Sequence, residues 1–67
     1  MSMFSERLKE LRLERCLSQR ELAAATNLSQ SSIVHWEKNN RVPNVDAVIA
    51  LAKYFNVSTD YILGLID

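Results

Sequence analysis

The 67-residue sequence has one cysteine, one proline, one glycine and no long uninterrupted run of apolar residues. A single cysteine excludes an internal disulfide. Because no apolar run approaches the roughly 20 residues of a membrane span or a secretory signal, we expect a protein of the reducing cytoplasm with no membrane partner. The scarcity of glycine and proline, together with 48% apolar residues, favours a small all-helical domain over a disordered chain.

Net charge is also absent, since eight basic residues balance eight acidic ones. Neutrality argues against binding of nucleic acid through overall charge. The charges are unevenly distributed, however. Residues 1–41 carry seven bases and five acids, a net charge of +2, and residues 42–67 carry a net charge of −2. Any DNA binding is therefore expected to rely on helix N-termini and base contacts more than on long-range attraction.

Chemical sites have little support in the sequence. Many hydrolases pair a cysteine with a histidine in catalysis, and this chain has Cys16 and His35. No third orienting group is evident, however, and a chain of this length is too small for an enclosed site. One cysteine and one histidine cannot fill the four positions of a structural zinc. We therefore expect no enzyme activity, no catalytic residues, no metal and no cofactor.

The most informative stretch is 17–38, LSQRELAAATNLSQSSIVHWEK, which contains two short helical patterns with almost no linker. Ser18 can cap the first helix, and Glu21, three residues later, completes a capping box. The helix therefore begins at Gln19. It ends near Asn27, a residue type that tolerates the left-handed backbone of a helix stop.

Ser29 caps the second helix, which is expected over about 30–38. Ile33, Trp36 and Glu37 fall at i, i+3 and i+4 and form its inward face. Trp36 has an alternative interpretation as a platform on which bases stack, but its spacing from Ile33 favours the core.

Three further helices complete the expected fold. The first covers residues 1–15, where an apolar stripe ends in Arg15, a cation suited to a helix C-terminus. A polar loop leads to Asn44, which caps a fourth helix that is apolar around much of its circumference and so expected to be buried. Ser58 caps a last short helix that Gly64 stops. The apolar positions of the fourth helix are Val45, Val48, Ile49, Leu51, Ala52 and Phe55.

The stretch LSQRELAAATNLSQSSIVHWE resembles the helix-turn-helix of the phage repressor and Cro type, also called the xenobiotic-response-element family. The chain departs from the family pattern at Cys16, Asn27 and Asn39, where glycine is usual, and at Val34, which is often serine. The matching positions are Leu17, Ser18, Gln19, Glu21, Leu22, Ala23, Leu28, Ser29, Ser31, Ile33, Trp36 and Glu37.

The resemblance implies a compact five-helix, lambda-repressor-like domain that covers residues 1–67, with the helix-turn-helix at about 18–38. It also implies an ion pair between Arg12 and Glu37 that ties the first helix to the third. From the residues alone, these are equally well two separate solvated charges. The implied function is sequence-specific binding of double-stranded DNA by a transcriptional repressor, as a homodimer on a palindromic operator.

A helix-turn-helix places its second helix in the major groove. The outward residues Gln30, Ser31, Val34 and His35 are therefore the candidate base contacts. Gln30 can bond adenine N6 and N7, Val34 can touch a thymine methyl, and either ring nitrogen of His35 can serve a guanine acceptor or a phosphate. In the family, the positions that match Gln30, Ser31 and His35 contact bases.

Phosphate contacts are expected to fix the register of the protein on the duplex without reading its sequence. In relatives, the residue matching Gln19 points its side chain and N-terminal amide at the DNA backbone. The remaining candidates follow the third helix: Lys38, Asn39, Asn40 and Arg41.

A second function, from another class, stays open at this point. The same fold can serve as an antitoxin-like or adaptor module that binds a protein. The neutral net charge and the apolar residues Leu65 and Ile66, which have no obvious place in the core, favour this alternative. DNA as the partner is favoured by the polar residues Gln30, Ser31 and His35 on the second helix of the motif, and by Arg41 in the loop that follows.

Overall fold

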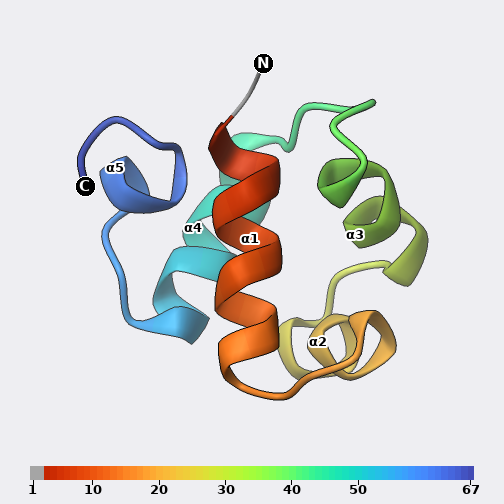
Figure 1. The fold of residues 1–67 in the computed structure, drawn as a ribbon. Coiled ribbons are helices and arrows are strands. Elements are labelled where there is room, and N and C mark those ends of the chain that lie inside the picture. Colours follow the sequence, from red (N-terminus) through yellow and green to blue (C-terminus); the bar gives the residue numbers. More distant parts are fainter. Residues whose placement is uncertain (1–2) are drawn as a thin grey trace.

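The computed structural model describes residues 3–67, which form five helices and no strand. The all-helical, five-helix architecture expected from the sequence is therefore confirmed. α1 runs through the middle, with α2 and α3 on one side, α4 behind it and α5 on the other side (Figure 1). The expected helix start at Met1 lies outside the described residues. The helices are α1 Met3–Glu14, α2 Gln19–Thr26, α3 Gln30–Glu37, α4 Val45–Phe55 and α5 Thr59–Ile62.

Side-chain caps begin four of the helices, as expected. Each capping oxygen accepts a hydrogen bond from a backbone N–H in the first helical turn, which would otherwise lack a partner. The capping box of α2 is complete, because Ser18 accepts from the Glu21 N–H and the Glu21 carboxylate accepts from the Ser18 N–H at 2.8 Å. These bonds hold the pKa of Glu21 below its ordinary value. The N-caps are Ser18, Ser29, Asn44 and Ser58.

Left-handed residues end the first four helices. Cys16, Asn27, Asn39 and Asn56 have φ values of 56°, 58°, 60° and 57°. The expected stop at Asn27 is thus confirmed. Asparagine occupies this conformation at modest cost, whereas Cys16 lacks that advantage because only Gly, and to a lesser extent Asn and Asp, visit it routinely.

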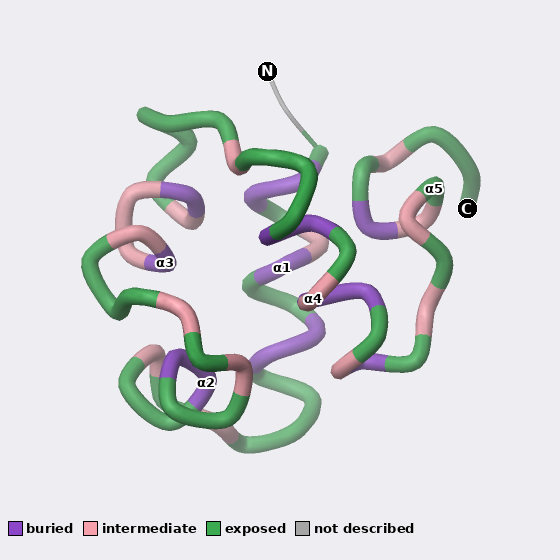
Figure 2. The backbone as a smooth tube through the Cα atoms, turned by 180° about the vertical axis from the view of Figure 1, so that it is seen from behind, coloured by how far each residue is buried: buried purple, intermediate pink, exposed green. Residues whose placement is uncertain are grey.

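All five helices contribute buried residues to one core, and these buried positions are purple in Figure 2. Phe4, Leu8 and Leu11 form the buried stripe expected for α1. Trp36 is 6% exposed, and its ring meets the edge of Phe4 with centroids 6.2 Å apart. Trp36 is therefore a core residue in this structure and has no face open for base stacking.

α4 is apolar around much of its circumference, as expected, but it is only partly buried. Val48, Leu51 and Phe55 are buried, but Val45 is 73% exposed and Ile49 is 39% exposed. The short α5 packs against α4, but its four residues are too few to cover these side chains. An apolar strip is consequently left on the surface.

Two arginines of the α1 region hold the C-terminal part of the chain. The guanidinium of Arg15 donates to the Phe55 carbonyl at 3.1 Å, so this cation serves the C-terminus of α4 rather than that of its own helix. Arg7 lies 4.2 Å from the centroid of the Tyr61 ring and donates to the carbonyls of Tyr61 and Ile66. α5 and the segment after it are thereby fixed against α1.

Gly64→Ala is expected to lower the free energy of unfolding by at least about 1 to 3 kcal/mol. This is the usual cost of placing a non-glycine residue in a left-handed backbone conformation. Gly64 has a φ of +81°, and a Cβ there would lie 2.2 Å from the Met3 Cβ, so the C-terminal turn must move away from α1. Urea denaturation followed by circular dichroism measures the change.

Cys16→Gly is the matched control, because it places glycine into the same backbone conformation and fills no space. It should raise the free energy of unfolding slightly, because it relieves the roughly 1 to 2 kcal/mol cost of a left-handed non-glycine residue and gives up only about 0.4 to 1 kcal/mol through the more flexible unfolded chain. Equal stability of the Gly64→Ala protein and the parent would show that the turn is not seated on α1.

Candidate nucleic-acid interface

One side of α3 gathers the four residues expected to contact bases. Gln30, Ser31, Val34 and His35 line a single shallow surface depression. They share a side because residues one, four and five positions apart cluster on a helix, roughly opposite the buried Ile33. Gln30 and Ser31 are exposed, and Val34 and His35 are half-buried. The depression is thus lined by three polar side chains and one aliphatic side chain.

The N-terminus of α3 is built to face an anion. Ser29 Oγ accepts from the Ser32 N–H at 3.0 Å and lies 3.2 Å from Ser31 Oγ, so the cap also restrains a candidate base contact. In α3, all of which the structure describes, the first turn contains no acidic residue. The positive end of the helix dipole therefore has no acidic residue beside it in its own first turn, and it favours a phosphate or an electronegative base edge.

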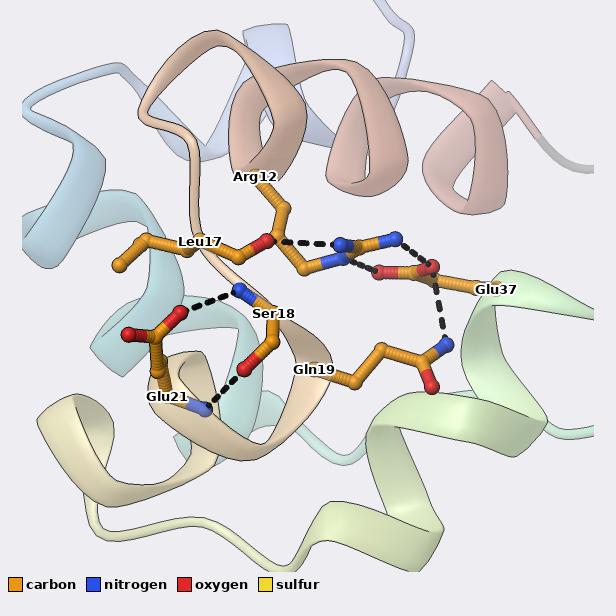
Figure 3. Close-up of polar contacts among 6 residues, drawn as sticks. All are labelled: Arg12, Leu17, Ser18, Gln19, Glu21 and Glu37. Carbon is orange, nitrogen blue, oxygen red and sulfur yellow. Dashed lines mark hydrogen bonds and ion pairs between the residues drawn. The ribbon is translucent and has the colours of Figure 1, made fainter.

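A cluster of polar and charged side chains around Glu37 joins α1, α2 and α3 (Figure 3). Arg12 donates from Nε to Glu37 Oε2 at 2.7 Å and from Nη2 to Glu37 Oε1 at 2.9 Å, a bidentate ion pair. A third bond runs from Arg12 Nη1 to the Leu17 carbonyl at 2.8 Å. The structure thus brings together the two residues for which the family resemblance implies an ion pair.

The Arg12–Glu37 ion pair is largely buried from solvent. The side chains of Arg12 and Glu37 are only 11% and 4% exposed. The hydrogen bond to Glu37 raises the pKa of the Arg12 guanidinium, which therefore stays charged. Across residues 3–67, no buried side-chain nitrogen or oxygen lacks a hydrogen-bond partner. Burying this charge pair is tolerable because every polar group in it is satisfied.

Gln19 belongs to the same cluster, a feature that sequence reasoning missed. Its Nε2 donates to Glu37 Oε1 at 3.2 Å. The amide nitrogen carries two hydrogens, so a second donor remains for a phosphate. Glu37 consequently orients the side chain that is expected to touch the DNA backbone from α2.

The loop after α3 exposes the other candidate phosphate contacts: Lys38, Asn39, Asn40 and Arg41. Asn40 is not a freely rotating side chain, since its Oδ1 lies 3.2 Å from His35 Nδ1. Sequence reasoning missed this pair as well. The two residues are five apart across a helix end, and no helical periodicity predicts such a contact.

Among residues 3–67, no three histidine, cysteine, aspartate or glutamate side chains group closely enough to hold a metal ion. No helix in the described part of the chain is long and apolar enough to cross a membrane. Cys16 is exposed at the turn after α1, and His35 lies on α3.

Known proteins resemble the chain over most of its length. It is 37% identical over 65 residues to the uncharacterized HTH-type transcriptional regulator YobD of Bacillus subtilis (strain 168), covering 97% of this chain and 58% of YobD. It is 34% identical over 55 residues to the cryptic phage CTXphi transcriptional repressor RstR of Vibrio cholerae, covering 82% of this chain and 50% of RstR. The chain therefore spans about half the length of these curated relatives.

A solved structure supports the same relationship. The restriction-modification controller protein C.AhdI from Aeromonas hydrophila superposes with a TM-score of 0.81 at 28% identity, covering 90% of this chain and 91% of that one. Residues 8–62 match the helix-turn-helix family model. This chain therefore belongs to the helix-turn-helix family of the phage repressor and Cro type.

Proposed function

We propose that this chain is a sequence-specific, double-stranded DNA-binding transcriptional regulator, and that it acts as a repressor. The observation that carries the proposal is the single surface on α3 formed by Gln30, Ser31, Val34 and His35. RstR, a relative, is named as a transcriptional repressor, and YobD as a transcriptional regulator. The whole of residues 1–67 serves this function as one domain, in the cytoplasm, without catalysis, metal or cofactor.

In this proposal α3 lies in the major groove and its polar side chains read base edges. Gln30, at the helix start, bonds adenine through N6 and N7, and Val34 contacts a thymine methyl. Ser31 donates or accepts according to the base it meets. His35 lies at the opposite end of this surface from Gln30 and contacts the base pair that faces it.

Phosphates on either side of the groove fix the position of the helix. Gln19 reaches one strand from the start of α2 through its second amide hydrogen and its backbone N–H. Lys38, Asn39, Asn40 and Arg41 reach the other strand from the loop after α3. The exposed position of these loop residues supports this assignment.

A second copy of the chain is proposed to complete the reader, because one recognition helix covers only half of a palindromic operator. The exposed apolar strip of α4 supports a surface for that copy. It forms a groove that shares no residue with the reading surface on α3, so both can be occupied together. The groove is lined by Pro43, Val45, Val48, Ile49, Thr59 and Leu63.

Ile49→Lys is expected to convert a concentration-dependent dimer into a monomer, because it places a charge in the middle of the apolar groove. Sedimentation equilibrium measures the change. Val42→Lys is the matched control, since Val42 is 90% exposed and lies outside the groove lining. A parent protein that stays monomeric both free and on DNA, or an equal effect of the two substitutions, would refute this surface.

Gln30→Ala is expected to weaken binding to the cognate DNA site by about 1 to 3 kcal/mol and to relax the base preference at one base pair. The lost bidentate contact to a base is the physical reason. Competition binding against a panel of single-base variants of the site measures both effects. An equal loss on every sequence would count against a base contact by Gln30.

Arg41→Ala is the contrasting variant for a phosphate contact. It should weaken binding by the same factor on every sequence and reduce the slope of log affinity against log salt by about one. An unchanged slope would remove Arg41 from the phosphate contacts, and a changed base preference would move it to the reading surface.

A further inference from the structure

The end of α3 is closed by a turn that places Asn40 over the last helical residues. The Asn40 N–H donates to the His35 carbonyl at 3.1 Å, and the Asn39 N–H donates to the Trp36 carbonyl at 3.0 Å. Together with the left-handed Asn39, these two bonds form a Schellman motif. The backbone of Asn40 is thereby fixed relative to His35.

The side chains of these two residues are also paired. Asn40 Oδ1 lies 3.2 Å from His35 Nδ1. A carboxamide oxygen can only accept, so the hydrogen in this bond must be on Nδ1 of the ring. A neutral imidazole has one N–H, which leaves Nε2 with a lone pair and no hydrogen. Within residues 3–67, the His35 side chain makes no other hydrogen bond.

We propose that Asn40 is a positioning residue that fixes His35 as the Nδ1–H tautomer, so that His35 presents an acceptor at Nε2 and selects adenine or cytosine. The proposal rests on the proposed function, because it requires His35 to face a base in the major groove. It deepens that function by assigning the base class read at one position and the residue outside α3 that determines it.

The base class follows from the hydrogen-bonding groups of the major groove. Adenine N6 and cytosine N4 carry amino hydrogens, whereas guanine N7 and O6 and thymine O4 are acceptors. An acceptor at His35 Nε2 can pair only with the amino groups. Neutral His35 therefore cannot serve a guanine acceptor or a phosphate through Nε2, although the sequence alone leaves those contacts open.

The assignment leaves Asn40 available for a phosphate. Its Oδ1 is held by His35, but its Nδ2 retains two donor hydrogens. Asn40→Ala should therefore have two separable effects. Loss of a phosphate contact weakens binding by the same factor on all sequences, whereas release of the tautomer changes the preference at one base pair alone.

Long-range proton–nitrogen NMR of the imidazole ring tests the tautomer without DNA. His35 is the sole histidine, so its two ring nitrogens are assigned without ambiguity. Under conditions where the ring carries a single hydrogen, the parent should show the Nδ1–H form. The Asn40→Ala protein should show the hydrogen moved largely to Nε2, and its amide spectrum reports whether it is folded. An Nε2–H form in the parent would overturn the proposal, whatever the protein does with DNA.

Selection from randomised duplexes tests the base preference for the parent, Asn40→Ala, His35→Ala and the double variant. The parent should favour adenine or cytosine about fivefold at one position, as expected from one ordinary hydrogen bond. Asn40→Ala should lose that preference, and adding it to His35→Ala should change nothing further at that position. A guanine preference that depends on His35, or a preference unaffected by Asn40→Ala, would overturn the proposal.

The two readouts separate the failure of this inference from the failure of the proposed function. A wrong tautomer together with an enriched DNA motif refutes the role of Asn40 and leaves DNA reading intact. The Nδ1–H tautomer together with no enriched motif for the parent refutes the proposed function, and the base selection by His35 with it.

Discussion

Glu37→Ala is expected to lower the free energy of unfolding by about 3 to 5 kcal/mol, the cost of leaving one member of a buried ion pair without its partner. The Arg12 side chain is 11% exposed, and its guanidinium would keep its charge after losing both bonds to the carboxylate. At roughly 0.05 to 0.15 kcal/mol per residue, a chain of this size has only about 3 to 10 kcal/mol of stability. Urea denaturation should therefore show a protein close to its unfolding threshold.

Two variants separate this explanation from a general effect of substitution. Glu10→Ala removes an exposed carboxylate from α1 and should change stability by less than about 0.5 kcal/mol. Arg12→Met combined with Glu37→Met replaces the pair by apolar side chains and should recover most of the loss. A loss below about 1 kcal/mol for Glu37→Ala would contradict a buried pair that depends on both charges.

Trp36→Ala is expected to cost about 3 to 5 kcal/mol, in the range of other large-to-small substitutions of buried aromatic residues. The indole is buried between α3 and α1 and meets the edge of Phe4. Its removal leaves a cavity at the place where the recognition helix is held to the rest of the fold. Thermal and urea unfolding followed by circular dichroism measure the loss.

Trp36→Phe is the control, because it keeps an aromatic edge contact and removes less volume; it should cost clearly less than the alanine variant. The same pair tests the alternative in which Trp36 stacks on bases. That alternative predicts normal stability for Trp36→Ala together with weaker DNA binding, which is the opposite of the result expected here.

Local features of this fold were predictable because local chemistry determines them. Ser18 with Glu21 marks a helix start through hydrogen bonds that span three residues, and asparagine marks a stop through its own backbone preference. Apolar spacing on α1 identified Phe4 and Leu8 as core residues. None of these predictions requires knowledge of which helices meet.

Features that depend on the arrangement of the helices were not predictable in the same way. The apolar residues of α4 do not reveal that a helix as short as α5 leaves Val45 and Ile49 exposed. Arg15 fits a cation at the end of its own helix, yet it binds the end of α4 because the two ends lie side by side. Such contacts follow from the packing of separate elements and leave no periodic signal in the sequence.

The candidate site shows the same division. Periodicity was sufficient to place Gln30, Ser31, Val34 and His35 on one side of a helix, and the structure gathers them on one surface. Their partners lie outside that helix: Asn40 bonds to His35 from the loop, and Ser31 lies beside the capping Ser29. The DNA group that His35 can contact depends on these partners, so the sequence alone left both a guanine acceptor and a phosphate open for it.

Selection of bound duplexes from a randomised library, performed at two salt concentrations, is the decisive test of sequence-specific DNA binding by this chain. We expect enrichment of a short motif in two inverted copies whose centres lie about 10 base pairs, one helical turn, apart. We also expect that enrichment persists at the higher salt while total binding falls. Salt-sensitive binding without an enriched motif, or no binding at all, would contradict a sequence-specific regulator and favour a module that binds another protein.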